Sequence, residues 1–104
     1  MNNPIILSND QVAEILTIPD CIEAIESLFQ EYYKHEYCGL IQMPPKVYLD
    51  IPNGDFRAMP ARVKNTAGIK WCGVHLDGSG TKRKVNIFAK VLINDIDSGK
   101  LLAI

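Results

Sequence analysis

The sequence lacks a disulfide framework, an excess of basic residues, a membrane-spanning apolar run and a signal segment. Its three cysteines, Cys21, Cys38 and Cys72, are an odd number at wide spacing, so no disulfide framework is predicted. Eleven Lys and Arg against twelve Asp and Glu give a net charge of -1, which gives no support to binding of nucleic acids or anionic membranes, since these require a dominant basic face. No apolar run approaches the roughly 20 residues that span a bilayer. The N-terminus lacks a basic signal segment. These absences favour a cytoplasmic protein with reduced thiols, and neither nucleic acid nor membrane as a partner.

The composition is that of a globular domain. Hydrophobic residues make up 47% of the chain and charged residues 22%, and 104 residues suit one domain over positions 1–104. The sequence stops at Ile104, inside an apolar run. We therefore expect this domain to be part of a larger protein that continues past it.

The N-terminal part of the sequence predicts two helices. Ser8, with Gln11 three residues later, forms a capping box, and Thr17 can cap a second helix with Asp20 near its positive end. Apolar residues then recur at spacings of three and four, so this helix is expected to run to about His35. They are Ile18, Ile22, Ile25, Phe29 and Tyr32.

After the helices, the hydrophobic period changes to two. This pattern predicts strands at 46–51, 55–63, 66–74, 85–93 and 101–104. The segment 85–93 is nearly all apolar and is predicted to be buried on both faces of the sheet. Two helices followed by strands predict an α+β fold with a mostly antiparallel or mixed sheet of about five to six strands.

The pair Asn53-Gly54 is typical of a two-residue hairpin turn. Such a turn would pair Pro52 with Asp55 and place Asp50 opposite Arg57. One face of the hairpin would then carry Lys46, Tyr48, Asp50, Arg57 and Met59.

Two interpretations of these cations stay open. In the first, Asp50 and Arg57 form an ordinary ion pair on a solvated surface, and Lys70 extends its ammonium group to a sheet edge. In the second, Arg57 binds a carboxylate through parallel N–H groups, with Lys46 as a second donor. Lys70 lies between Ile69 and Trp71, and cations in such apolar company are costly unless an anion meets them. The carboxylate of a small substrate is the candidate anion.

Residues 77–82 resemble a nucleotide-binding loop but lack its chemistry. A P-loop has Lys before Ser or Thr, whereas here Thr81 precedes Lys82. The third glycine position of a dinucleotide fingerprint is Arg83. We therefore predict no cofactor-binding residues in this chain.

A zinc site is also rejected. His35 and Cys38, with Cys72 and His75, have the residue types that bind zinc. However, Cys72 and His75 are three apart on a predicted strand, so their side chains point to opposite faces. We predict no metal site.

The segment MPPKVYLDIPNGDFRAMPA, followed by AGIKW and AKVLINDIDSGKLLAI, resembles the N-terminal part of the ornithine cyclodeaminase/mu-crystallin family. This family includes an archaeal-type alanine dehydrogenase. The likeness covers nearly the whole chain and is specific from about Gln42 onward. It implies that residues 1–104 are a substrate-binding and dimerisation domain, which precedes a Rossmann domain for NAD or NADP. It also implies an amino-acid or imino-acid substrate and a homodimer.

Position by position, the resemblance implies four site residues. Lys46 falls at a basic substrate-site position, and Arg57, before AMPA, at the carboxylate-binding arginine. Lys70, in AGIKW, matches the catalytic lysine that contacts the substrate, and Asn86 matches a position near cofactor and substrate. An arginine can orient a substrate by its carboxylate, and a nearby lysine can stabilise developing charge or relay a proton.

Three hypotheses follow. The leading one is the substrate-binding part of an NAD(P)-dependent amino-acid or imino-acid enzyme, of the ornithine cyclodeaminase or alanine dehydrogenase type, inactive as the isolated fragment. The second is a non-catalytic small-ligand-binding protein of the mu-crystallin type. The third is a structural dimerisation module that pairs through an exposed sheet edge.

Overall fold

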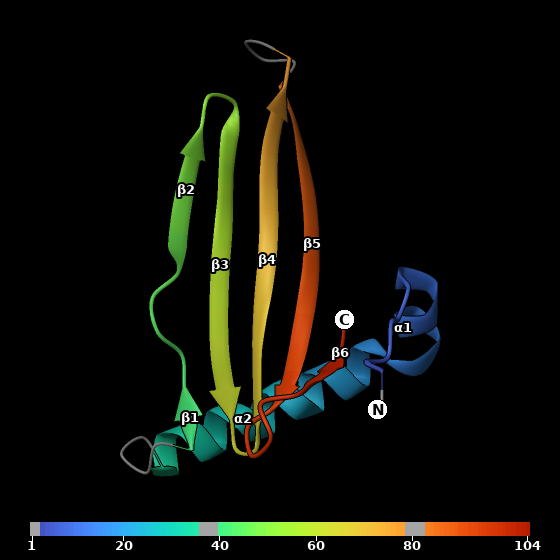
Figure 1. Cartoon of the computed structure of the whole chain (residues 1–104), viewed down its shortest axis with the longest axis vertical. Coiled ribbons are helices and arrows are strands. Elements are labelled where there is room, and N and C mark those ends of the chain that lie inside the picture. Colours follow the sequence, from blue (N-terminus) through green and yellow to red (C-terminus); the bar gives the residue numbers. More distant parts are fainter. Residues whose placement is uncertain (1–2, 36–39, 79–82) are drawn as a thin grey trace.

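The computed structural model of the chain describes residues 3–35, 40–78 and 83–104. Within these residues, two helices precede a six-stranded antiparallel sheet, as the sequence predicts (Figure 1). The five pairs of named strands are all antiparallel, and Ile5 adds an isolated parallel bridge to Ala103 of β6. The helices are α1 (Asn9–Ile15) and α2 (Ile18–His35). The strands are β1 (Ile41–Gln42), β2 (Val47–Ile51), β3 (Gly54–Val63), β4 (Thr66–Asp77), β5 (Lys84–Asp95) and β6 (Leu101–Ala103).

Both helices begin where the sequence predicts. Ser8 Oγ accepts a hydrogen bond from the Gln11 amide at 3.2 Å, and the Gln11 side chain accepts one from the Ser8 amide at 2.9 Å. Thr17 and Asp20 make the equivalent reciprocal pair, each at 3.2 Å. The side-chain and backbone hydrogen bonds from Thr17 lower the pKa of Asp20. Neither helix within the described ranges is long and apolar enough to cross a membrane.

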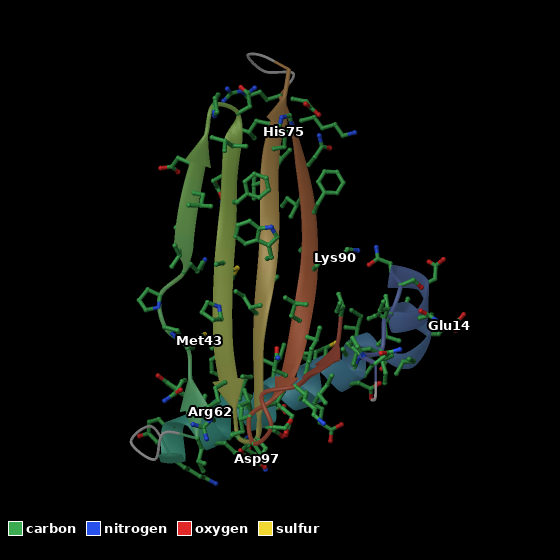
Figure 2. All side chains as sticks on the ribbon, in the orientation of Figure 1. Glu14, Met43, Arg62, His75, Lys90 and Asp97 are labelled. Carbon is green, nitrogen blue, oxygen red and sulfur yellow. The ribbon has the colours of Figure 1, made fainter. Side chains whose placement is uncertain are left out.

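The strand order is β1-β3-β4-β5-β6, and β2 also pairs with β3. The short β1 pairs with the C-terminal end of β3, at Val63, and β2 pairs with its N-terminal half. The segment between them contains Pro44 and Pro45, which lack the N–H groups that a continuous ladder needs. One long edge therefore becomes two short ones, and Met43 lies in the connection (Figure 2).

The sequence predicts that the hairpin turns at Asn53-Gly54. In the structure, the turn between β2 and β3 lies one residue earlier. Ile51 pairs with Gly54, so Pro52 and Asn53 form the turn and the prediction is wrong. Gly54 also pairs with β4, where a Cβ atom on it would lie 1.8 Å from the carbonyl oxygen of Val74. This glycine therefore permits a close approach between strands instead of forming the turn.

The earlier turn changes the partners across the hairpin but keeps its faces. Asp50 lies opposite Asp55, and Tyr48 lies opposite Arg57, so the predicted Asp50–Arg57 pair is wrong. Because the partner of Asp50 moves from Arg57 to Asp55, two positions along β3, every side chain stays on its predicted face. The grouping of Tyr48, Asp50, Arg57 and Met59 on one face is confirmed.

The ladders define two faces of the sheet, because cross-strand partners share a face and neighbours along a strand do not. We call one the cationic face; it includes Tyr48, Asp55, Arg57, Met59, Lys70, Cys72 and Val91. We call the other the aromatic face; it includes Val47, Leu49, Ile51, Phe56, Trp71, Gly73, Phe88 and Lys90.

The described part of the chain has almost no enclosed core. Its buried hydrophobic residues are Ile41 and Cys72, each 6% exposed. The predicted burial of residues 85–93 on both faces is wrong, since Phe88 is 72% exposed and Val91 is 46% exposed. The reason lies in the architecture: α2 crosses one end of the sheet and α1 stands beyond β5 and β6, so most of the strand length is uncovered (Figure 1).

Candidate functional site on the cationic face

Arg57 and Lys70 lie on neighbouring strands and on the same face of the sheet. Arg57 pairs with Cys72, and Lys70 pairs with Met59, so the two cations are diagonal neighbours. Diagonal positions on adjacent strands are about 7–8 Å apart, within the reach of long side chains. Both can therefore contact one small anion.

The guanidinium of Arg57 is held by two neighbours. Its Nε donates to Asp55 Oδ1 at 2.6 Å, and its Nη2 donates to Asp55 Oδ2 at 3.2 Å. Its central carbon lies 5.2 Å from the centre of the Tyr48 ring, which is cation–π geometry. Among the described residues, these contacts use two of the five N–H groups of the arginine and leave the others to bind a ligand.

Asp55 and Arg57 each shift the pKa of the other. The hydrogen bonds from Arg57 lower the pKa of Asp55, and the hydrogen bonds to Asp55 raise the pKa of Arg57. The Asp55 side chain is 20% exposed and that of Arg57 is 32% exposed, so the pair lies partly out of solvent. Arg57 is therefore a fixed cation with a remaining open side.

Lys70 is exposed and lies at the edge of an apolar hollow. It pairs with Met59 on one side and with Val91 on the other. The hollow has a volume of about 250 Å³, and its lining includes Met59, Gly68, Val91 and Ile93. A ligand held by the two cations would find apolar surface beside Lys70 for a short aliphatic group.

Lys46 immediately precedes β2, whose first pair joins Val47 to Ala58. If that ladder continued by one residue, Lys46 would pair with Met59 of β3. On its other side, Met59 pairs with Lys70 of β4. Strands are about 4.8 Å apart, so Lys46 and Lys70 would lie roughly 10 Å apart across β3. The position of Lys46 on the cationic face therefore stays a prediction, and the structure places Lys46 directly before β2.

Asn86 lies on the aromatic face, away from the other three predicted site residues. It pairs with His75 in the ladder, and its amide donates a hydrogen bond to the Asp77 carboxylate. The other oxygen of Asp77 lies 3.1 Å from His75 Nδ1. The sheet therefore places Arg57 and Lys70 on one face and Asn86 on the other.

Within residues 3–35, 40–78 and 83–104, no three His, Cys, Asp or Glu side chains are grouped as metal ligands. Cys72 pairs on the cationic face and His75 on the aromatic face, as the strand period predicts. Cys38 lies outside the described residues. The rejected nucleotide-binding loop also falls partly outside them, at 79–82.

Sequence reasoning missed Asp55 and Tyr48 as neighbours of Arg57. Asp55 precedes Arg57 by two residues, and residues two apart on a strand share a face. That spacing was a signal available in the sequence. Tyr48 could be found only with the correct hairpin register, which depends on the contact between Gly54 and Val74.

Comparisons with known proteins identify the protein family of this chain. The ornithine cyclodeaminase/mu-crystallin family matches residues 2–104. Alanine dehydrogenase from Archaeoglobus fulgidus is 35% identical over 100 residues, covering 96% of this chain and 30% of that protein. A solved structure described as an archaeal alanine dehydrogenase dimer with bound NAD matches with a TM-score of 0.75 and 33% identity, again over 96% of this chain and 30% of the other.

The chain belongs to the ornithine cyclodeaminase/mu-crystallin family. It spans about a third of the length of the relatives that it matches, 30% in each case. Within the described residues, its named strands pair antiparallel, and Ile5 makes an isolated parallel bridge with Ala103.

Proposed function

We propose that this chain is the substrate-binding part of an NAD(P)-dependent enzyme that acts on amino acids or imino acids. The observation that carries this proposal is the fixed guanidinium of Arg57, diagonal to Lys70 on one face. The family membership and the similarity to an alanine dehydrogenase support the class of enzyme and substrate.

Each cation has a distinct role in this proposal. The open N–H groups of Arg57 bind the substrate carboxylate, because a planar guanidinium matches a carboxylate with two parallel hydrogen bonds. Lys70 Nζ lies beside the reacting carbon, where it stabilises developing charge or relays a proton. Lys46 is a further donor for the carboxylate. Asn86 is proposed as a residue near cofactor and substrate in the complete enzyme, from its position in the family alone; within this chain its side chain lies on the face opposite Arg57 and Lys70.

The same proposal assigns the redox chemistry to NAD or NADP, which supplies hydride transfer when it is bound. The isolated chain is then expected to show no turnover with either cofactor and a panel of amino acids. We further propose that the chain forms a homodimer, which the description of the similar structure as a dimer supports.

The proposal is tested by ligand titration of the chain followed by NMR. L-Alanine and L-ornithine are compared with L-alaninamide, which keeps the amine and lacks the carboxylate. We expect the two amino acids, but not the amide, to shift the Arg57 Nε–H resonance and the amides flanking Lys70. Weak, millimolar binding is sufficient for this readout.

Matched variants make the test specific. Lys70→Gln is expected to weaken amino-acid binding by about tenfold, which corresponds to one charge-assisted hydrogen bond. Lys100→Gln, an exposed lysine in the turn before β6, removes the same charge elsewhere and should leave binding within about twofold of the wild-type chain. Equal binding of amino acid and amide, or equal effects of the two variants, would contradict the proposed carboxylate site.

A further inference from the structure

The apolar hollow beside Lys70 is formed by neighbouring positions that carry little or no side chain. Ala61 of β3 pairs with Gly68 of β4, and Gly68 pairs with Ile93 of β5, so the centre of this row is low. Larger apolar side chains stand around it and complete the lining of the hollow; they include Met59, Val63 and Val91. The hollow, of about 250 Å³, therefore has a floor of small residues and apolar walls.

Three consecutive rows of the cationic face present an arginine, a lysine and this hollow, in that order. Arg57 pairs with Cys72, the next row holds Lys70, and the row after it pairs Ala61 with Gly68. Rows that share a face are two residues apart, which is about 6.6 Å along a strand. An amino acid with its carboxylate on Arg57 and its reacting carbon beside Lys70 would therefore direct its side chain toward the hollow.

The hollow offers no acidic group to a charged side chain. Among the described residues that line it, Lys70 carries the only charge, and Thr66 is the only other polar side chain. The ammonium group of a basic substrate would therefore lie on apolar surface beside a second ammonium group. Loss of hydration and like-charge repulsion both oppose that arrangement.

The acidic residues of the cationic face lie elsewhere. Asp50 and Asp55 form the row on the far side of Arg57 from the hollow. Asp95 pairs with Thr66, four residues from Lys70 along β4, or about 13 Å. Its carboxylate accepts hydrogen bonds from the Ser98 amide at 2.9 Å and from the Ser98 hydroxyl at 2.6 Å. A side chain as short as that of ornithine would not reach it from Lys70.

We infer that this hollow binds the side chain of the substrate and selects an uncharged aliphatic group, such as that of norvaline or leucine, over a basic one. The inference rests on the proposed function and specifies its substrate class. An apolar cavity of about 150 Å³ can hold benzene, so a hollow of about 250 Å³ has room for a propyl or isobutyl group. Alanine would leave most of it empty.

Titration of the chain with L-norvaline and L-ornithine tests the inference, because the two differ only in the terminal ammonium group. We expect norvaline to bind at least about tenfold more tightly than ornithine. Norvaline should also bind about tenfold more tightly than L-alanine, since each buried methylene contributes up to about fourfold. In NMR spectra, norvaline but not alanine should shift the methyl resonances of Ala61 and Ile93.

A pair of substitutions on β3 shows whether the hollow is responsible. Ala61→Leu fills the floor, so norvaline should then bind no better than alanine. Ala58→Leu is the matched control: it makes the same change on the same strand, but Ala58 pairs with Trp71 on the aromatic face. It should keep the preference for norvaline. Circular dichroism establishes that both variants are folded.

A third substitution supplies the charge that the hollow lacks. Ala61→Asp places a carboxylate on its floor and should reverse the preference, so that ornithine binds more tightly than norvaline. This result does not depend on the folding of Ala61→Leu. Equal binding of norvaline and ornithine by the wild-type chain, or a norvaline preference that survives both Ala61 variants, would overturn the inference.

The ligands separate this inference from the proposed function on which it rests. Tighter binding of alanine than of alaninamide reports on the carboxylate site, and the ratio of norvaline to ornithine reports on the hollow. A chain that prefers alanine to its amide and binds norvaline and ornithine equally would keep the carboxylate site and refute the hollow as a side-chain site. A chain that binds none of these amino acids would refute both.

Discussion

The contact between Gly54 and the Val74 carbonyl predicts a large effect from the smallest possible substitution. In Gly54→Ala the new Cβ would lie 1.8 Å from a backbone oxygen, which cannot rotate away. Relief requires β3 and β4 to separate at this point. Overpacking of this kind costs about 1–3 kcal/mol. The backbone φ of 152° at Gly54 is unfavourable for residues with a side chain, which adds roughly 1 kcal/mol.

Gly99→Ala is the matched control for this substitution. Gly99 also has a positive φ, of 74°, but a Cβ there would meet nothing within 4 Å. It should cost only the backbone strain, about 1–2 kcal/mol. Urea unfolding measured by circular dichroism compares the two variants, and we expect Gly54→Ala to be less stable than Gly99→Ala by about 1–2 kcal/mol.

Gly54→Ala should also change the side-chain arrangement of the candidate site. Gly54 fixes the register that places Tyr48 opposite Arg57, so a displaced β3 should weaken the nuclear Overhauser contacts between the Tyr48 ring and the Arg57 side chain. Gly99→Ala should leave those contacts intact. Equal unfolding free energies for the two variants, with unchanged Tyr48–Arg57 contacts in both, would refute the account of Gly54.

Four further predictions concern the site and the helix start. Asp55→Asn should broaden and shift the Arg57 Nε–H resonance and weaken amino-acid binding, because the guanidinium loses its anchor; an unchanged resonance would show that Asp55 does not position it. The pKa of Asp55 is lowered below its ordinary value of 3.8, so its contribution to stability is present above pH 3.8 and is lost as pH falls through the lower pKa of the folded chain. An NMR titration from pH 6 to 2 checks this, and a midpoint above 3.8 would contradict it. Asn86→Ala should leave amino-acid affinity within about twofold, since the side chain lies on the other face; calorimetry showing a larger loss would place Asn86 in the site. Ser8→Ala should cost about 1 kcal/mol in urea unfolding through loss of the cap, and no measurable cost would mean that this cap does not stabilise the folded chain.

Local sequence patterns were sufficient to predict where the helices begin and which strand residues share a face of the sheet. Ser8 and Thr17 determine where the helices start through bonds to residues three positions away, which are visible in the sequence. The two-residue period placed Arg57 on the same face as Tyr48 even though the predicted turn was wrong, because the register error moved partners by two positions. Local periodicity therefore predicts a face more reliably than a partner.

The features that could not be predicted depend on distant parts of the chain or on other molecules. Asn53-Gly54 is a favourable turn by itself, and only the approach of Val74 from β4 explains why Gly54 joins the ladder. The exposure of Phe88 likewise cannot be read from an apolar strand. Such a strand indicates that something covers it, and the sequence does not distinguish a helix of the same chain from a second molecule.

The pairing of the N-terminal segment with β6 has a consequence for folding. Ile5 donates to the Leu102 carbonyl at 2.8 Å, Leu7 donates to the Ile104 carbonyl at 2.9 Å, and Ile104 donates back to Ile5 at 2.9 Å. Closing a loop of nearly the whole chain costs more entropy than closing a hairpin, although only by about 0.6 kcal/mol for each doubling of loop length. On the ribosome, Ile5 has no strand partner until residues 102–104 have been synthesised. The hairpins from β2 to β5 can therefore form first, and the segment before α1 is added to the sheet last.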